Sequence, residues 1–252
     1  LQTGSADVAA NAAKQLAERG VDVDVVEVEV RRAGGPEAAA RSARYAVLEA
    51  QDTDAVLLAH TLDDQAETVL LGLGRGSGPR SIAGMAEVNG LFRRPFLALR
   101  RSDTEQICVA SGLTWWVDPH NSDPAFRRVR IRSEALPVLE DVLGGGVAEA
   151  LARTADQVRA DGAYLDDLAG AVDEPLAVQT LETLATVVRT RVLRRTALAA
   201  GADPSALTAT HLAELDRLIT DWHGQLRIEL PGGVACVRDG DSLAYVTTPV
   251  GG

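Results

Sequence analysis

Apolar and polar positions along the first half of the chain follow the periods of alternating helices and strands. Residues 5–19 have the apolar spacing of a helix that begins at an N-cap, Ser5, and residues 21–30 (VDVDVVEVEV) alternate as a β-strand does. A second helix is expected from Pro36 to Ala50, since proline is favoured in a first helical turn. Helices and strands joined by such short links are typical of the α/β class with a parallel sheet.

The stretch from Asp54 to Gly84 organises the chain, because it places a polar turn between a strand and a helix. The apolar run from Ala55 to Ala59 predicts a buried strand of a parallel sheet. The next helix is expected to begin at Asp63, whose side chain can serve as the N-cap. In α/β proteins, the loops at the carboxyl ends of the strands face the crevice that holds the chemistry.

Three side chains suited to acid–base chemistry lie at this turn. His60 ends the strand, and Asp64 and Glu67 share one helix face because they are three residues apart. One histidine and two carboxylates in a crevice suit proton transfer, recognition of an amine or binding of a metal ion. The alternative is that the carboxylates only complement the dipole of the helix.

The pattern from Gly74 to Leu143 is less regular. Its features are a glycine-rich loop at 74–81, a turn at Asn89-Gly90, a short strand within 91–99, and a helix over 126–143 that is interrupted before Pro137. A further helix is expected to begin at Ser102, with Glu105 completing a capping box. Trp115 and Trp116 are expected in the core at the edge of the sheet, with stacking against an unpaired base as the alternative.

Three consecutive glycines, 144–146, mark the expected boundary between a domain at 1–143 and a domain at 147–252. Amphipathic patterns predict helices over 147–170, 181–200 and 207–222. The last segment predicts two or three short strands, so the second domain is expected to be mostly helical with a small β tail.

Composition indicates the cellular compartment and reveals one positively charged stretch of the chain. No apolar run of the 252 residues approaches the roughly 20 that span a bilayer, and there is no signal-peptide pattern. Cys108 and Cys236 form no CxxC motif, so a reducing, cytoplasmic setting is expected. The net charge of −11 disfavours nucleic acid, yet residues 93–132 hold eight arginines against four acidic residues, a local +4. These arginines could meet phosphate, or they could form solvated and ion-paired surfaces.

Four segments resemble the tRNA(Ile)-lysidine synthase family. They are GPEAAARSARYAVLE (35–49), AHTLDDQAETVLLGLGRGSGPRSIAGM (59–85), RRPFLALRR (93–101) and WVDPHNSDPAFRRVRIRSEALPVLE (116–140). The resemblance implies a Rossmann-like, nucleotide-hydrolase-like PP-loop domain that binds ATP, followed by a helical domain that binds the tRNA substrate. It also implies a reaction: ATP adenylates C2 of cytidine 34 in the CAU anticodon of tRNA(Ile), and free L-lysine displaces AMP to give lysidine.

Two departures from the family pattern stand out. The SGGxDS phosphate loop of the family is not in these 252 residues, and LQTGSADVAA (1–10) resembles the segment just after the family's second strand. The first strand and that loop are therefore expected before Leu1. These 252 residues by themselves would lack the main pyrophosphate cradle and one acidic catalytic residue of the family, and an inactive fragment is one alternative. The second departure is Arg128-Val129, where the family usually has Arg-Asn.

By motif match, His60, Asp64 and Glu67 correspond to the catalytic pocket of the family. Asp64 and Glu67 are expected to hold the ammonium group of lysine, and His60 to assist activation or proton transfer. One of the two carboxylates could instead bind Mg²⁺, which the resemblance implies together with ATP.

The resemblance places Arg41 and Arg44 at the ATP phosphates or at the tRNA near the pocket, and the spacing and charge of other basic and loop residues suggest further contacts with the substrates. Those expected at the ATP phosphates are Arg41, Arg44, Arg128 and Arg132, of which Arg128 and Arg132 are four residues apart on one helix face. Those expected at tRNA are Arg75, Ser77 and Arg80 in the glycine-rich loop, and Arg191 and Arg195 on a basic helix face that also includes Arg189 and Arg194. For each set, a solvated surface or a plain helix-exit loop is the alternative.

Two other functions stay open at this point. One is another PP-loop enzyme that modifies tRNA, such as a thiolase or an amidating ligase, although thiolation would favour more cysteines than two. The other is an RNA-binding fragment without catalysis. The family often forms dimers, so a homodimer is the assembly that the resemblance suggests, and no membrane partner is expected.

Overall fold

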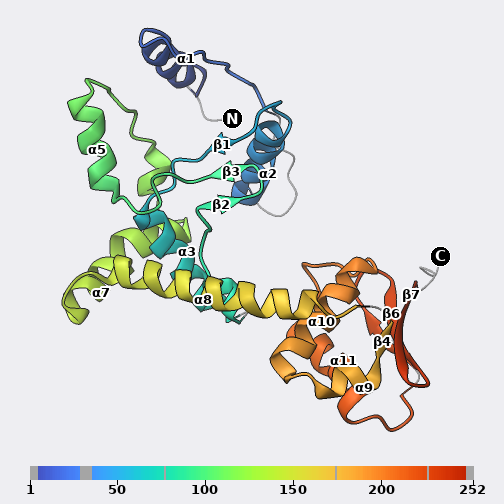
Figure 1. Ribbon diagram of the computed structural model, residues 1–252. Coiled ribbons are helices and arrows are strands. Elements are labelled where there is room, and N and C mark those ends of the chain that lie inside the picture. Colours follow the sequence, from blue (N-terminus) through green and yellow to red (C-terminus); the bar gives the residue numbers. More distant parts are fainter. Residues whose placement is uncertain (1–4, 29–35, 77, 174, 226, 248–252) are drawn as a thin grey trace. The chain divides into compact units, whose positions relative to one another are not determined.

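The computed structural model describes residues 5–28, 36–76, 78–173, 175–225 and 227–247. They form two compact units, one up to Arg159 and the other from Ala160 onward (Figure 1). The division falls inside the long helix α8 (Val147–Gly170), whereas the sequence placed the boundary at the glycine run before this helix. Among the described residues, no helix combines the length and the hydropathy needed to cross a membrane.

A small mixed sheet lies at the centre of the first unit. Its strands are β1 (Val56–Leu57), β3 (Phe92–Arg93) and β2 (Val88–Asn89), in that order. β1 runs parallel to β3, and β2 pairs antiparallel with β3 across the turn at Gly90, as Figure 1 shows. Helix α2 (Pro36–Glu49) packs on this sheet through Tyr45, whose ring contacts Phe92 edge to face at 4.9 Å between centroids. The parallel pair and the α2 helix confirm the α/β prediction.

Two strand predictions in this unit need correction. Leu57 in β1 is 69% exposed, so the strand exists but is not buried. Residues 21–28, which follow helix α1 (Ser5–Ala17), run as an irregular segment, and no described strand pairs with them; residues 29 and 30 lie outside the described part. Alternation provides two faces for a strand, but a strand forms only where a neighbour accepts its hydrogen bonds.

Helix α3 (Leu62–Arg75) starts at a cap other than the predicted one. Its N-cap is Thr61, which forms a capping box with Asp64, and Gly76 ends it in the left-handed conformation (φ 63°). Its buried side packs into a small core that consists of Ala66, Leu136, Val147 and Ala148, with Leu70, Ile131, Leu139 and Leu151 around it. Helix α4 (Pro79–Ile82) approaches α3 so closely that a Cβ on Gly72 would lie 1.8 Å from the carbonyl oxygen of Ser81.

The segment after the polar connection is helical but not uniform. It comprises α6 (Arg127–Arg130), a π-helical turn η2 (Ile131–Ala135) and α7 (Leu136–Leu143), and it follows the short 3₁₀ helix η1 (Pro119–Ser122). The predicted interruption before Pro137 is therefore confirmed as a π-helical turn. Such turns often mark functional sites, because they change which side chains share a face.

Helix α5 (Arg101–Ala110) also begins differently from the prediction. The backbone N–H of Arg100 donates to the carboxylate of Asp103 at 2.9 Å, so Asp103 rather than Glu105 closes the first turn. Every residue of α5 is at least partly exposed. Trp115 and Trp116 are 48% and 49% exposed, which corrects the expectation that they lie in the core.

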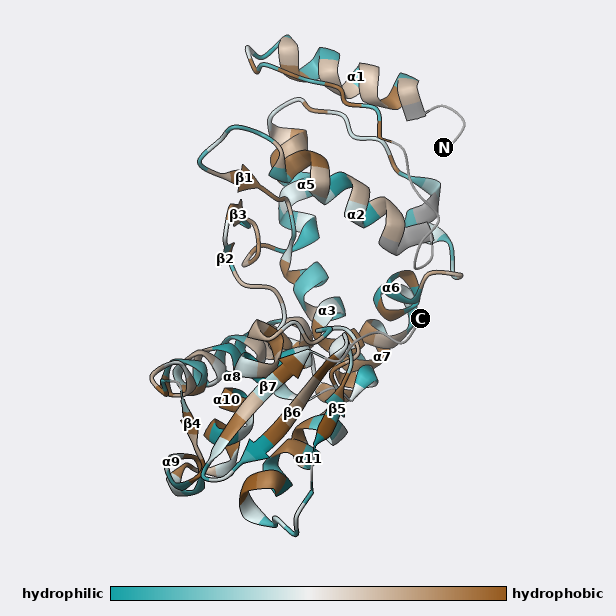
Figure 2. Cartoon of the chain, turned by 90° about the vertical axis from the view of Figure 1, so that its right-hand side faces the viewer, coloured by the Kyte–Doolittle hydropathy of each residue, from teal (hydrophilic) through white to brown (hydrophobic). Residues whose placement is uncertain are grey.

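The second unit packs short helices against an antiparallel sheet. Its elements after α8 are β4 (Leu176–Ala177), α9 (Val178–Thr183), α10 (Thr186–Ala199), α11 (Ala209–Thr220), β5 (Ile228–Leu230), β6 (Val234–Asp239) and β7 (Ser242–Thr247). The strand order is β4-β7-β6-β5. Figure 2 shows apolar stretches on these strands, and the core includes the fully buried Leu181, Leu193 and Leu215. The predicted helical unit with a β tail is confirmed.

Candidate functional site

Asp64 connects the fold of α3 to a cluster of arginines. Its Oδ2 accepts hydrogen bonds from the backbone N–H and the hydroxyl of Thr61, both at 2.8 Å. Its Oδ1 faces two guanidinium groups, with Nη2 of Arg101 at 3.5 Å and Nη2 of Arg132 at 3.6 Å. One oxygen thus stabilises the helix N-terminus, and the other takes part in the site.

Glu67 lies one turn further along α3 and is completely buried. Its Oε1 accepts a hydrogen bond from Nε of Arg132 at 2.7 Å, and Nη1 of Arg128 lies 3.6 Å from its Oε2. Oε2 has no hydrogen-bond partner among the described residues. Burial raises the pKa of Glu67, and the positive charge of Arg132 opposes that rise. A buried carboxylate with one oxygen that accepts no hydrogen bond is unusual in an ion pair that serves only the fold.

The arginines come from α6 and the π-helical turn that follows it. Arg128 and Arg132 both reach α3, where Arg128 also donates to the hydroxyl of Thr68 at 3.2 Å. Arg130, which lies between them in the sequence, forms an exposed pair with Glu134 instead. The structure therefore brings the predicted residues Arg128 and Arg132 to the predicted carboxylates, over 60 residues away in sequence.

His60 is half-buried, and its Nδ1 has no hydrogen-bond partner within the described ranges. Burial lowers its pKa, the charges of Arg94, Arg41 and Arg44 lower it further, and Asp64 opposes them. The imidazole is therefore neutral at neutral pH. Arg41 and Arg44, expected near ATP phosphates, lie close enough to His60 to influence its charge.

Several neighbours of the site escaped the sequence analysis. Asp63, expected as the N-cap of α3, instead accepts the backbone N–H of Arg101 at 2.7 Å and so holds the start of α5. Arg100 donates through Nε to Glu149 of α8 at 2.7 Å. The pair Arg100-Arg101 directly before a predicted helix was the available signal, because two adjacent arginines there can reach acidic residues on two sides.

The loop residues predicted to bind tRNA lie elsewhere. Arg75 ends α3 and is exposed, about 16 Å along the helix axis from Asp64 at 1.5 Å per residue. Arg80 is exposed on α4, and Ser77 lies outside the described residues. The structure does not bring Arg75 to the carboxylates.

The predicted basic face in the second unit is only partly exposed. Arg189 is buried and pairs with Asp216, so its inclusion in a surface patch is wrong. Arg191 pairs with Asp166 at 3.0 Å, and the exposed Arg195 donates to the carbonyl of Val172 at 2.6 Å.

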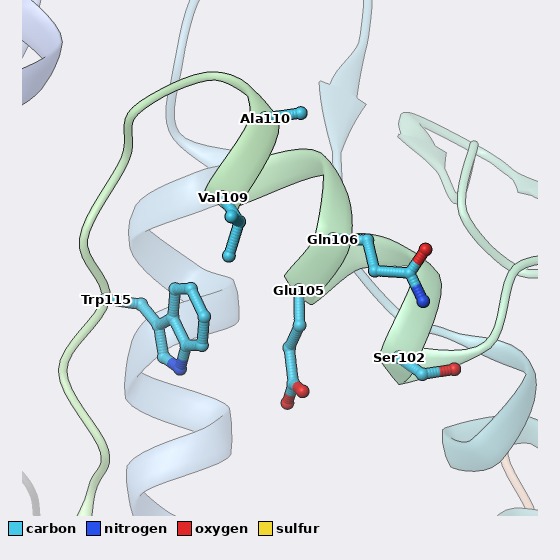
Figure 3. Close-up of a pocket in the computed structure, with 6 residues that line it drawn as sticks. All are labelled: Ser102, Glu105, Gln106, Val109, Ala110 and Trp115. Carbon is cyan, nitrogen blue, oxygen red and sulfur yellow. The ribbon is translucent and has the colours of Figure 1, made fainter.

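An open hollow of about 440 Å³ lies beside α5. Figure 3 shows Trp115 and the α5 side chains that line it, including Glu105 and Val109. Its lining residues lie outside every predicted site set. In the part of the chain that the structure describes, no group of three or more His, Cys, Asp or Glu residues is placed to hold a metal ion.

The fold and the site define a PP-loop protein, the class whose domain model matches residues 2–139. A model of the TilS substrate-binding domain matches residues 176–243. Membership of the PP-loop class implies use of ATP.

Relatives give the narrower family. The tRNA(Ile)-lysidine synthase of Streptomyces coelicolor is 51% identical over 258 residues, which cover 96% of this chain and 73% of that protein. The enzymes of the same name from Thermobifida fusca and Mycobacterium tuberculosis are each 52% identical, with 92% and 93% of this chain covered and 75% and 74% of theirs. The chain belongs to the tRNA(Ile)-lysidine synthase family, as the sequence motifs indicated.

Proposed function

We propose that this protein joins L-lysine to C2 of cytidine 34 in the CAU anticodon of tRNA(Ile), using ATP and releasing AMP and diphosphate. Its family membership supports the reaction, and the observation that carries the site is the meeting of Asp64 and Glu67 with Arg128 and Arg132. Carboxylates suit an incoming amine, and guanidinium groups suit phosphates, so one site has groups for both substrates.

The reaction has two steps. In the first, the oxygen on C2 of cytidine attacks the α-phosphorus of ATP; an O–P bond forms, and the bond to the β-phosphate breaks, releasing diphosphate. In the second, an amine of lysine attacks C2; a C–N bond forms, the C2–O bond breaks, AMP leaves, and the amine loses a proton. Charge develops on phosphate oxygens in both steps, and fixed cations stabilise it.

The chain's residues have separate roles in this proposal. Arg128 and Arg132 bind phosphate oxygens, Arg41 and Arg44 add positive charge beside His60, and Asp64 and Glu67 bind the ammonium group of lysine. His60 accepts the proton that the amine loses, and the low pKa that keeps it neutral fits this role.

Mg²⁺ fits this site only when it binds together with the phosphates of the nucleotide. Asp64 and Glu67 already face guanidinium groups, and Mg²⁺ commonly takes one or two carboxylates together with substrate phosphates. Bound in that way, the ion would neutralise phosphate charge.

For the tRNA, we propose contacts through Arg75, Ser77, Arg80, Arg191 and Arg195. Arg195 is the clearest candidate in the second unit, since its side chain is exposed. Arg195→Ala should weaken tRNA binding at low salt and leave ATP binding unchanged. We place the protein in the cytoplasm and expect a homodimer, which its mass in solution would test.

Thiolation is disfavoured by the cysteines. Burial raises the pKa of Cys236 to about 12, so this thiol stays protonated and is a poor nucleophile. Cys108, the other cysteine, is free and half-buried on α5.

Labelled lysine tests the proposed function. The full-length protein is incubated with ATP, Mg²⁺, tRNA(Ile) bearing a CAU anticodon and labelled L-lysine, and label in the tRNA is measured. We expect incorporation by the unchanged protein and a loss of at least about 100-fold in Asp64→Asn, with Glu134→Gln as the exposed control. Equal incorporation by Asp64→Asn would refute the assignment of Asp64, and binding of tRNA without incorporation would favour an RNA-binding module.

Separate binding measurements test the arginines. In Arg128→Ala and Arg132→Ala, we expect ATP affinity to fall while tRNA affinity changes less; Arg130→Ala is the matched control, because Arg130 points to Glu134. Unchanged affinity for both ligands in both variants would remove these arginines from the phosphate site.

A further inference from the structure

The site holds more positive than negative charge. Arg101, Arg128 and Arg132 contribute three guanidinium groups within 3.6 Å of the carboxylates of Asp64 and Glu67. The five side chains therefore carry a net charge of +1 when both carboxylates are ionised. A lysine ammonium that approached this cluster would meet this excess of positive charge, and both carboxylates already face arginines.

The two kinds of charged group also differ in exposure. The side chains of Arg101, Arg128 and Arg132 are 38%, 35% and 29% exposed, whereas Glu67 is 0% exposed. An incoming anion would therefore meet guanidinium groups first, while the carboxylate of Glu67 lies behind them. The order in which ligands reach the site follows from this arrangement.

We propose that Arg101, Arg128 and Arg132 act as an exchangeable clamp: the triphosphate of ATP draws them away from Asp64 and Glu67, and the freed carboxylates then bind lysine. Lysine binding thus depends on bound nucleotide, and the two ligands bind with positive cooperativity. The inference rests on the proposed function, because it assigns the same residues to ATP and lysine. It adds Arg101 to the phosphate-binding residues and gives an order of binding.

Two features of the carboxylates favour exchange over a permanent pair. Oε2 of Glu67 has no hydrogen-bond partner within the described part of the chain, and its nearest guanidinium nitrogen, on Arg128, lies at 3.6 Å. An ammonium group has three N–H donors and could satisfy this oxygen, which the arginines do not. Asp64 keeps its Oδ2 in the capping box throughout, so exchange at Oδ1 leaves α3 intact.

The segment that carries two of the arginines suits a small movement. Arg128 lies on α6 and Arg132 in the π-helical turn η2, where the hydrogen-bond pattern differs from the helices on either side. Arg101 is the first residue of α5, and its main chain is fixed by Asp63 while its side chain faces Asp64. Exchange therefore needs mainly the arginine side chains to move, and the core around Ala66, which includes Ile131 of this turn, can stay in place.

The experiment measures lysine affinity by calorimetry with and without α,β-methylene ATP, an analogue that cannot release diphosphate. We expect the saturating analogue and Mg²⁺ to increase lysine affinity at least tenfold, and saturating lysine to increase the affinity for the analogue by the same factor. The same lysine affinity with and without the analogue would overturn the inference.

Variants identify the side chains responsible. In Arg132→Ala, we expect lysine to bind more tightly without nucleotide than it does in the unchanged protein, and the nucleotide effect to fall below threefold. Arg130→Ala, which removes an arginine two positions away, should keep the full effect. If circular dichroism shows that Arg132→Ala is unfolded, Arg101→Ala decides, because Asp64 keeps Arg132 as a partner in that variant. A full nucleotide effect in the folded variants would overturn the clamp.

The labelled-lysine assay separates this inference from the proposed function. If lysidine forms while lysine affinity ignores the nucleotide, the clamp is wrong and the function stands. If no lysine enters tRNA although lysine and nucleotide bind cooperatively, the function is wrong and the clamp stands.

Discussion

Each unit contains an arginine–carboxylate pair with one buried partner, Glu67 in the first unit and Arg189 in the second, and the pairs are built differently. In the second unit, Nε of Arg189 donates to Asp216 at 2.6 Å, and its Nη groups donate to the carbonyl of Leu184 and the hydroxyl of Thr186. In the first unit, Arg132 donates to Oε1 of Glu67, and the other carboxylate oxygen has no hydrogen bond among the described residues.

This difference separates a structural pair from a functional cluster. Around Arg189, hydrogen bonds reach all three guanidinium nitrogens, and one arginine meets one carboxylate. Around Glu67, three arginines meet two carboxylates, and burial raises the pKa of Glu67 against the charge of Arg132. Buried polar groups left unsatisfied in a native fold are often reserved for a ligand.

The largest expected effect on stability is at the structural pair. Arg189→Met should destabilise the second unit by about 3–5 kcal/mol, because Asp216 would keep its charge without its partner. Urea unfolding measures this loss. Replacing both residues with apolar ones, Arg189→Met with Asp216→Leu, should recover most of it; failure to recover would mean that the pair does more than fill the core.

Thr61→Ala tests whether Asp64 really divides its two oxygens between fold and site. The variant should lose about 0.5–2 kcal/mol of stability, the usual value of an N-cap, because the Thr61 hydroxyl donates to Oδ2 of Asp64 and accepts from the backbone N–H of Asp64. Lysine incorporation at a temperature where the variant stays folded should fall much less than in Asp64→Asn. An equal loss of activity in both would show that the cap and the site cannot be separated.

The charge of His60 gives a smaller and pH-dependent effect. Burial lowers the pKa of His60 in the folded state, so the unfolded chain binds the proton more readily. The folded protein therefore loses stability as the pH falls through the ordinary pKa of histidine toward the lower pKa of His60. Nuclear magnetic resonance of the ring nitrogens should give a pKa below that of free histidine. A value above it would mean that Asp64 outweighs burial and the arginines.

The smallest effect is expected at the exposed pair of Arg130 and Glu134. Both side chains are more than half exposed, so Arg130→Ala should leave the Tm and the ATP affinity unchanged within error. A marked loss of ATP affinity would mean that Arg130 also binds phosphate, although it pairs with Glu134 in the structure.

Much of the fold could be predicted because local rules dominate in the helices. The positions of the helices over 5–17, 36–49 and 147–170 follow from proline, glycine and apolar spacing to within about two residues, although Ser5 begins the first helix and is not its N-cap. The segment at 21–28 failed because a strand needs a partner that its own sequence does not reveal.

The residues of the candidate site could be predicted from the sequence, but not which of them lie together in the fold. Spacing placed Asp64 and Glu67 on one helix face, and Arg128 and Arg132 on another, but nothing local indicates that these faces meet. The N-cap of α3 was misassigned for the same reason, since the carboxylate of Asp63 is engaged by the backbone of Arg101, 38 residues away. Arg189 was placed on a surface because charge alone does not reveal a carboxylate partner on another helix.

One matched measurement tests whether Glu67 serves the site while Asp216 serves the fold. Glu67→Gln and Asp216→Asn each replace an arginine-bound carboxylate with an amide, and both lysine incorporation into tRNA(Ile) and urea unfolding are measured. We expect Glu67→Gln to stay folded and to lose incorporation at least about 100-fold, and Asp216→Asn to lose stability and keep the activity of its folded fraction. Full incorporation by Glu67→Gln, or a folded Asp216→Asn without activity, would contradict it.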